Sequence, residues 1–304
     1  MKTIGVTGGN GLLGTKILHT AEGKYQTVSI DLQEEPFWLP KKGRYVTADI
    51  SNQQIFFEKL SPIPLEGIIN TAAFTNVDGC ETQKERAYAV NAKGVESVAR
   101  FCAEKKIRLI HVSTDYVFDG KNGPYDEEAK PHPVSFYGKT KLDGEVAVQK
   151  LLDNFVIART TVLYGYMPNA RLNFVTWLIA KLSKGESVQI VNSQWGNPTL
   201  ADDLASALFV LFESGLKGIY NTVGRDWLNR FEFAKKIVEI FELDDRLIQP
   251  IPERSLKQPA ARPAKGGLTL DKIQSDTDYQ FLSVKESLEK MKQQMVEDGV
   301  WPPA

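Results

Sequence analysis

A glycine-rich turn near the start of the chain, GGNGLLG at residues 8–14, limits the available folds more than any other segment. It separates a short apolar run at residues 2–7 from a helical pattern that begins at about Leu12. In this context Gly8 permits a tight turn, Gly11 lets the backbone approach a pyrophosphate, and Gly14 lets the helix pack on the sheet. The helix N-terminus favours a bound phosphate. The segment predicts a dinucleotide-binding βαβ unit rather than a plain βα turn. Contacts are expected from Gly8, Asn10, Gly11, Leu12, Leu13 and Gly14.

Short β-rich runs alternate with helical patterns through the first half of the chain. Strands are expected at residues 2–7, 26–31, 45–48, 67–70, 107–112 and 154–159, and the main helices at 12–21, 84–105 and 135–152. Such alternation is typical of βαβ units that build a parallel sheet covered on both faces. We therefore expect an α/β fold, with a Rossmann-type doubly wound parallel sheet, over residues 1–165.

The pattern loosens after about residue 165. Helical stretches are expected near 172–183, 201–214, 229–242 and 284–298, and short strands near 188–191 and 218–222. We expect residues 166–304 to form most of a smaller α+β substrate-binding lobe over the carboxyl edge of the sheet, where open α/β folds bind ligands. This boundary is soft, because the chain is expected to cross between the two parts more than once.

Acidic residues follow the second and third expected strands. Asp31 ends the second strand, where a carboxylate can accept hydrogen bonds from both hydroxyls of an adenosine ribose and repels a 2′-phosphate. No arginine follows at Leu32 or Gln33, so the sequence favours NAD(H) over NADP(H). Asp49 and Ile50, after the third strand, are expected near the adenine, although a helix-capping loop explains them nearly as well.

Tyr137 and Lys141 stand one helical turn apart in the segment FYGKTKLDGE at residues 136–145. Residues at i and i+4 share a helix face. A nearby cation should lower the pKa of the phenol from about 10, which would make its proton easier to transfer. Taken alone, the pair fits a solvated helix face better; after a dinucleotide-binding half, an active site is favoured.

A second stretch supports the active-site interpretation. In HVSTDYVFDG, residues 111–120, Ser113, Thr114 and Asp115 fall at the carboxyl end of the fifth expected strand. A hydroxyl there can hydrogen-bond a substrate carbonyl and hold it against Tyr137. The nucleotide turn, the strand-end hydroxyl and the Tyr–Lys pair together predict hydride transfer to or from a carbonyl or an alcohol.

Composition excludes several other classes of function. The 304 residues are 42% hydrophobic and carry a net charge of −1, so no basic field exists to attract nucleic acid or a membrane surface. We expect no signal peptide, no membrane span and a cytoplasmic location, with Cys80 and Cys102 as reduced thiols. The three histidines are scattered and predict no metal site.

Six segments of the sequence match a known family closely: GGNGLLG (8–14), AAFTNVDGCE (72–81), VNAKG (90–94), STDYVFDG (113–120), PYDEEAKPHPVSFYGKTKLDGE (124–145) and RTTVLYG (159–165). Through them the sequence resembles the extended short-chain dehydrogenase/reductases, and within these the dTDP-4-dehydrorhamnose reductase group. NPTLADDLA (197–205) and RPAKGGL (262–268) match more loosely. The resemblance spans nearly the whole chain, and STDYVFDG followed by YGKTKLDGE is its specific part.

The resemblance implies roles for individual residues. Thr114, Tyr137 and Lys141 would form the catalytic set, with Tyr137 protonating the C4 oxygen of a keto-sugar and Lys141 also binding the nicotinamide ribose. Further contacts with the cofactor are expected at Ala72, Ala73 and Asn91, and contacts with the sugar nucleotide at Thr75, Val77, Asp115, Tyr116, Val162 and Arg262. Arg262 could instead lie at the lobe interface or on the surface. The implied substrate is dTDP-4-dehydro-L-rhamnose.

Two features keep other interpretations open. Members of the reductase group commonly carry tryptophan where this chain has Val162, which puts the identity of the sugar in doubt. The segments YGKTKLDGE and RTTVLYG are also similar to the regulatory β subunit of methionine adenosyltransferase, which implies a dinucleotide-binding protein that acts through an enzyme partner. A homodimer is compatible with either interpretation. Some related reductases bind a dimer-bridging magnesium ion at acidic residues such as Asp126–Glu128, but a solvated loop is favoured here.

Overall fold

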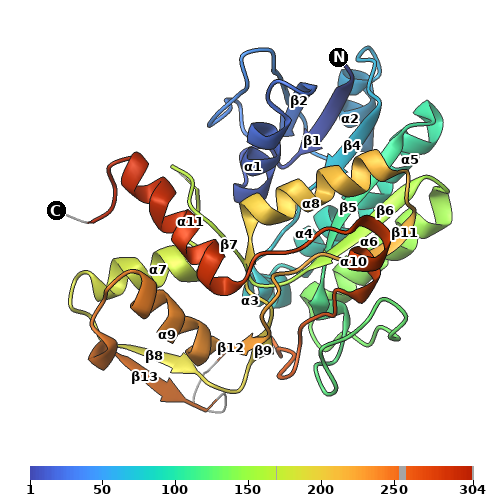
Figure 1. The fold of residues 1–304 in the computed structure, drawn as a ribbon. Helices are drawn as coiled ribbons and strands as arrows, with labels where there is room; N and C mark the ends of the chain where they lie inside the picture. The colour runs from blue at the N-terminus through green and yellow to red at the C-terminus, as the bar shows by residue number, and fades with distance from the viewer. Residues whose placement is uncertain (169, 253–257, 303–304) are drawn as a thin grey trace.

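The computed structural model describes residues 1–168, 170–252 and 258–302. At its centre lies a seven-stranded sheet in the order β11-β6-β5-β4-β1-β2-β3, with every neighbouring pair parallel (Figure 1). The strands are β1 (Thr3–Thr7), β2 (Gln26–Asp31), β3 (Arg44–Thr47), β4 (Gly67–Asn70), β5 (Arg108–Thr114), β6 (Phe155–Thr160) and β11 (Gly218–Asn221). The expected parallel α/β sheet is thereby confirmed.

Successive apolar residues of the central strands point to opposite faces and build two separate cores. Ile69, Ile110 and Val156 pack beneath α1 (Leu12–Ala21), α8 (Ala201–Ser214) and α10 (Asp271–Thr277). Their neighbours Ile68, Leu109 and Ile157 pack on the other face against α2 (Gln53–Leu60), α5 (Val95–Lys105) and α6 (Phe136–Leu151). The near-continuous apolar runs of these strands follow from burial on both faces.

The second half of the chain contributes to this sheet as well as to a smaller lobe. Strand β11 pairs with β6, and α8 and α10 cover one face of the sheet. Only part of the segment after residue 165 therefore packs away from the sheet. The division at residue 165 stays a prediction, with a sheet strand and two covering helices on its far side.

The smaller lobe has its own apolar core, formed by α7 (Phe174–Leu182), α9 (Arg230–Ile240) and α11 (Val284–Glu297) with the parallel pair β8 (Val188–Val191) and β13 (Ile248–Ile251). All three helices begin with capping boxes, at Asn173, Asn229 and Ser283. These elements gather on one side of the molecule, away from the N-terminus (Figure 1). Within the described ranges, no helix is long and apolar enough to cross a membrane.

Two pairs of very short strands connect the lobe with the sheet. Strand β7 (Leu163–Tyr164) pairs with β10 (Thr199–Leu200), and β9 (Trp195–Gly196) pairs with β12 (Leu228–Asn229). Strand β7 follows the carboxyl end of β6 in the chain, with only Thr161 and Val162 between them. Strands of two residues carry no readable periodicity, and the sequence did not predict them.

The long helix expected at residues 84–105 is not uniform. It consists of α4 (Lys84–Tyr88), a π-helical segment η1 (Ala89–Gly94) and α5, and a further short helix, α3 (Val77–Thr82), precedes it. The apolar spacing predicts the helical run, but not the wider turn that the backbone makes at η1. Such π-turns are frequent at functional sites, and this one contains the buried Asn91.

The strand order reverses between β1 and β4, which makes this the position where a doubly wound sheet opens a crevice. At their carboxyl ends Thr7 Oγ1 donates to Asn70 Oδ1 at 2.5 Å, and Thr71 Oγ1 donates to the Thr7 carbonyl at 2.7 Å. The glycine turn follows β1 directly, and Gly8 has a φ of 69°, a left-handed conformation that glycine adopts without strain.

We expect Gly14→Ala to destabilise the protein by about 1–3 kcal/mol, because a methyl group there would lie 2.1 Å from the Gly8 carbonyl oxygen. The usual gain of up to about 1 kcal/mol for alanine over glycine in a helix would be outweighed. Gly165→Ala is the control, since its added methyl meets Ala201 Cβ at an ordinary 3.4 Å. Urea unfolding measures both, and equal stability of the two variants would contradict the expectation.

Candidate active site

The N-terminus of α1 offers a cradle for a pyrophosphate. Its N-cap, Gly11, makes no side-chain capping bond, and the first turn holds no acidic residue. Gly11 N donates to the Gly8 carbonyl at 2.9 Å, while the N–H groups of Gly8 and Gly9 are tied to Ile30. The first turn of a helix has N–H groups without intrahelical partners, so the donors and the positive dipole end fit an anion here.

Asp31 and Asn10 organise the edge of this cradle. Asp31 Oδ2 accepts from Asn10 N at 3.0 Å, and its Oδ1 accepts from Leu32 N at 2.8 Å. The Asn10 amide donates to Gln33 and to the Glu35 carbonyl, and its oxygen accepts from Phe37 N. Asn10 therefore holds the loop after β2, and its contact with a cofactor stays a prediction.

The remaining predicted cofactor residues lie along the same edge of the sheet. Ala72 and Ala73 follow β4 and are half-buried. Ile50 is buried, whereas Asp49 is exposed and accepts hydrogen bonds from the backbone and hydroxyl of Ser51. Asn91 is fully buried and bonds both the backbone N–H and carbonyl of Phe74 and the Thr140 hydroxyl. It thus ties the loop after β4 to α6.

The predicted catalytic residues meet at the carboxyl end of β5. Thr114 ends that strand, and Tyr137 and Lys141 lie on the first turns of α6, which Ser135 caps. All three side chains are nearly inaccessible, with Tyr137 exposed by 9% and Lys141 by 2%. Lys141 Nζ donates to the Val112 carbonyl at 2.8 Å. Tyr137 packs against Cys80 and Ala87 and edge-on to Tyr116.

Burial acts on the two titratable groups in opposite directions. It raises the pKa of Tyr137 well above its usual value, although the hydrogen bond with Thr114 opposes this shift. It lowers the pKa of Lys141 to about 8, with the Glu145 carboxylate acting in the opposite sense. The expectation that Lys141 lowers the pKa of Tyr137 is wrong for this structure. Loss of solvation outweighs any effect of the ammonium, which is directed to the Val112 carbonyl.

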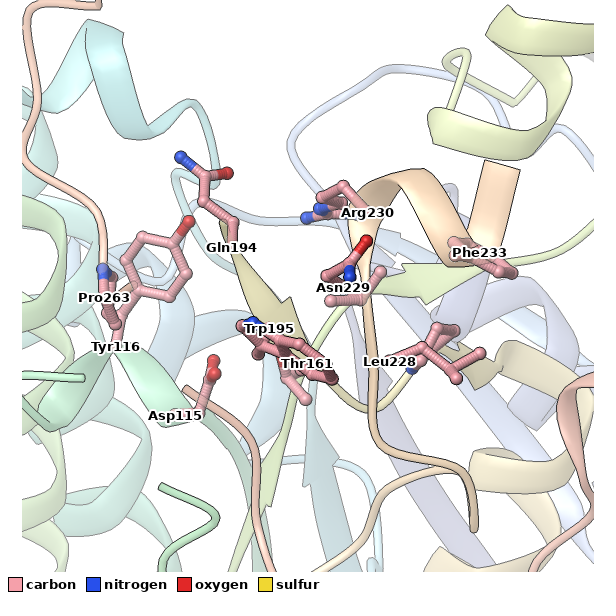
Figure 2. A pocket seen from close by; sticks show the side chains of 13 residues that line it. Asp115, Tyr116, Thr161, Gln194, Trp195, Leu228, Asn229, Arg230, Phe233 and Pro263 are labelled. Carbon is pink, nitrogen blue, oxygen red and sulfur yellow. The ribbon is translucent and has the colours of Figure 1, made fainter. Parts of the chain in front are cut away.

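A pocket opens beside these residues, between the sheet edge and the smaller lobe. Asp115, Tyr116, Thr161, Val162 and Pro263 line one part of it. The rest of its lining comes from Gln194, Trp195, Gly196, Pro198, Leu228, Asn229, Arg230 and Phe233. Figure 2 shows Tyr116 and Arg230 on opposite sides, with Gln194 between them. Three of the predicted substrate residues, Asp115, Tyr116 and Val162, therefore lie together.

Val162 and Asp115 are held in unusual states within this pocket. Val162 has a φ of 47°, a conformation that is strained for a β-branched side chain. Its carbonyl accepts from Thr199 N at 3.1 Å, which fixes the turn. Asp115 is buried, which raises the pKa of its carboxyl, and it accepts from Gly267 N at 3.1 Å. Asp115 thereby attaches the segment around Gly267 to the carboxyl end of β5.

Other predicted substrate residues lie outside the pocket lining. Thr75 is exposed, and Val77 begins α3, where it packs beside Tyr137. Arg262 forms a two-pronged ion pair with Asp78 of α3, at 2.8 and 3.1 Å, and also donates to the Ala260 carbonyl. Three roles were left open for Arg262: a substrate contact, a place at the lobe interface and a place on the surface. The ion pair with Asp78 supports the interface role.

Arg230 and Gln194 are lining residues that the sequence did not single out. Arg230 is the first residue of α9, and its guanidinium stacks over the Phe174 ring at 5.2 Å. Burial lowers its pKa from the usual value. No carboxylate of the described residues forms an ion pair with it. The sequence offered little reason to expect Arg230 in the site. An arginine directly after the N-cap of a helix is common, and it suggests ligand binding only when that helix is known to face the site.

His111 and the acidic run have structural partners. His111 is buried in β5, where Asn70 bonds its Nδ1 at 3.0 Å, and burial holds its pKa well below the usual value. Asp126 accepts from the backbone of Glu128 and Ala129, and Glu127 accepts from Asn221 N. No group of three or more potential metal-binding acidic, histidine or cysteine side chains occurs among the residues described.

The parallel sheet, the glycine turn and the buried Tyr–Lys pair define a dinucleotide-dependent oxidoreductase. Residues 1–297 match the model for the RmlD substrate binding domain, and the chain belongs to that family. It is 32% identical to a dTDP-4-dehydrorhamnose reductase from Aggregatibacter actinomycetemcomitans, over 88% of this chain and 91% of that one. The recognised resemblance is therefore confirmed.

A solved structure and a second relative bear on the details. The crystal structure of dTDP-4-dehydrorhamnose reductase from Bacillus anthracis in complex with NADP superposes with a TM-score of 0.87, at 30% identity, over 97% of this chain and 100% of that one. The methionine adenosyltransferase 2 subunit beta of Xenopus laevis is 35% identical over 61% of this chain and 58% of its own length. A nicotinamide cofactor therefore fits the chain.

We expect Lys141→Met to stabilise the fold at pH 7 by roughly 3 kcal/mol, the cost of a buried ammonium whose pKa falls from about 10.4 to about 8. Below pH 8 this penalty is complete. Between pH 8 and about 10.4 the folded protein releases the proton before the unfolded chain does, so this group's contribution to stability rises with pH. Urea unfolding at pH 7 and pH 9.5 should show the largest difference between variant and wild type at pH 7; a constant difference would refute the assignment.

Proposed function

We propose that the protein reduces the C4 ketone of a nucleotide-activated deoxysugar, with dTDP-4-dehydro-L-rhamnose as substrate and dTDP-L-rhamnose as product. The observation that carries the proposal is the buried set of Thr114, Tyr137 and Lys141 at the carboxyl end of β5, directly beside a pocket with polar and aromatic walls. Membership of the RmlD family supports the same chemistry.

The catalytic roles follow from the properties of the side chains. A bound reduced nicotinamide would supply the hydride that reaches C4. Thr114 would hold the carbonyl oxygen by a hydrogen bond, and Tyr137 would give that oxygen its proton as the alcohol forms. Because burial raises its pKa, Tyr137 keeps its proton at neutral pH until the substrate arrives. Lys141, on the same helix face, would stabilise the phenolate left behind and hold the nicotinamide ribose.

The pocket supports recognition of a nucleotide diphosphate sugar. Arg230 brings a guanidinium without an ion-pair partner among the described residues, and guanidinium groups bind phosphates by paired hydrogen bonds. Trp195 offers an indole beside it, braced by Trp227 with the ring centroids 4.6 Å apart, on which a base or sugar ring can rest. Val162 also lines this pocket, at the position where the resemblance to the reductase group implies a tryptophan.

The form of the cofactor is proposed from the loop after β2. Asp31 is followed by Leu32, Gln33, Glu34 and Glu35. The carboxylates of Asp31, Glu34 and Glu35 would repel the 2′-phosphate of NADP(H). We therefore propose that NADH is preferred, although a relative binds NADP. We also propose a cytoplasmic location, since both cysteines are buried and unpaired. A homodimer stays an expectation.

One relative favours a second candidate function, the regulation of an enzyme partner. The similarity to the methionine adenosyltransferase 2 subunit beta supports a protein that keeps the dinucleotide site and regulates an enzyme partner with little turnover of its own. Purified wild-type protein that binds NADH, shows no reductase activity and retains a methionine adenosyltransferase in a pull-down would favour this alternative.

We expect Tyr137→Phe to lower turnover by about 10²–10⁴-fold, because the proton donor is lost, while the affinity for NADH is kept. The assay follows NADH and NADPH oxidation with enzymatically generated dTDP-4-dehydro-L-rhamnose, and NADH fluorescence reports binding. Tyr125→Phe is the control, since that ring stacks on Phe118 and its hydroxyl bonds Asp119 away from the catalytic set. A fully active Tyr137→Phe protein would reject Tyr137 as the donor.

We expect Arg230→Gln to raise KM for the nucleotide-sugar by about 10- to 100-fold with little change in the Kd of NADH, because one charge-assisted contact to a phosphate is lost. Arg225→Gln is the matched control: Arg225 is an exposed arginine of the preceding loop that pairs with Glu286. An unchanged KM would show that the diphosphate binds elsewhere.

A further inference from the structure

A buried cluster of three side chains lies directly beneath the catalytic residues. Ser113 of β5 and Arg159 of β6 are neighbours across the two parallel strands, and Glu145 of α6 reaches both of them. Arg159 donates to the two carboxylate oxygens of Glu145 at 3.0 and 2.7 Å, and Ser113 Oγ donates to one of them at 2.6 Å. The side chains of Arg159 and Glu145 are exposed by only 2% and 0%.

We infer that Glu145 is a positioning residue for the proposed reduction: held by Arg159 and Ser113, it sets the place of α6 on the sheet and keeps the ammonium of Lys141 charged. This inference rests on the proposed function, because it gives Lys141 a role in catalysis.

The geometry ties the catalytic set together from below. Glu145 follows Lys141 by one helical turn, on the same face of α6. Ser113 immediately precedes Thr114, so one carboxylate connects the helix that carries Tyr137 and Lys141 with the strand that carries Thr114. Arg159 is fixed in turn, since its carbonyl accepts from both the N–H and the hydroxyl of Thr222 and its guanidinium lies over the Phe118 ring. Sliding or rotation of α6 would break a two-pronged, charge-assisted contact.

The charges around Lys141 assign the electrostatic part of the role to Glu145. Its carboxylate is the group that favours the ammonium, against the loss of solvation. On β5, His111 is buried and neutral at physiological pH; on β6, Arg159 is already paired with Glu145. Asp115, Tyr116 and Cys80, from η2 (Asp115–Val117) and α3, act on Tyr137.

The other elements packed on α6 carry charges that face elsewhere. Lys93 of η1 and Arg100 of α5 both pair with Glu96 at the surface. On α4, Lys84 lies over the Phe136 ring and Arg86 over the Phe74 ring. Glu81 of α3 does face α6, but it accepts from Phe136 N at the start of the helix. Among the described residues, Glu145 is the carboxylate that favours the proton on Lys141.

The test compares Glu145→Gln with wild type in two pH profiles, that of kcat/KM for the keto-sugar and that of the Kd for NADH measured by fluorescence. Because the amide lacks the negative charge, we expect the basic limb of both profiles to move to lower pH by about one unit, with a correspondingly weaker NADH affinity near pH 8. Glu96→Gln is the matched control, a carboxylate that also receives two bonds from an arginine but at the surface.

A second variant guards against a folding defect, since Glu145→Gln leaves the buried Arg159 without its partner. Glu145→Gln/Arg159→Met also removes the guanidinium that the single change would leave unpaired. Lys141 still lacks its carboxylate, so a shift in the same direction is expected. The inference would be overturned if the folded variants were less stable to heat but the basic limbs of both profiles did not move. The cluster would then be a structural ion pair only.

Failure of the proposed function would look different. Wild type without turnover on any keto-sugar would remove the first profile, but the pH dependence of NADH binding would still report on Lys141. A shifted binding profile in the variants would then retain the positioning role, and an unshifted one would reject it.

Discussion

All seven strands of the sheet run in the same direction, and the rest of the molecule depends on this constraint. Parallel strands bring their carboxyl ends to one edge, so residues distant in sequence become neighbours without any long-range design of their own. Gly8, Asp31, Ala72, Thr114 and Thr161 each stand at the end of a strand or just beyond it. The proposed cradle for the dinucleotide, the proposed catalytic hydroxyl of Thr114 and the wall of the pocket are consequently successive positions along the same edge.

Burial then decides the electrostatics of that edge. Tyr137 and Lys141 are both removed from water, and each is pushed towards its neutral form. For the tyrosine this retains the proton that it would deliver in the proposed reduction. For the lysine it opposes the charge that the same proposed step needs, and Glu145 favours that charge. The stability lost by burying the ammonium would then be the counterpart of a catalytic role for Lys141, a common relation at active sites.

The sequence predicted those parts of the fold that depend on local pattern. The helix at residues 12–21 and the strands at 26–31 and 67–70 have the bounds expected from apolar runs and turn residues. It could not predict the π-helical turn that contains Asn91, because the apolar spacing continues through it without a break. Nor could it find Arg230, since an arginine on a capped helix becomes informative only once the lobe is folded against the sheet. The expected effect of Lys141 on Tyr137 was wrong for a related reason: spacing placed the pair on one face, but the loss of solvation depends on everything packed around it.

The pocket proposed for the substrate is built from less regular structure than the cradle proposed for the cofactor. Its walls come from strand pairs of two residues each, from a strained Val162 and from the segment that Asp115 holds at Gly267. Loops of this kind accept substitutions that a central strand would not. Tryptophan at position 162 would have to adopt the same left-handed backbone and would occupy space that Val162 leaves beside Trp195. The scaffold therefore fixes hydride transfer to a carbonyl, whereas the choice of sugar depends on a few side chains in connecting segments, which is where family resemblance has the least force.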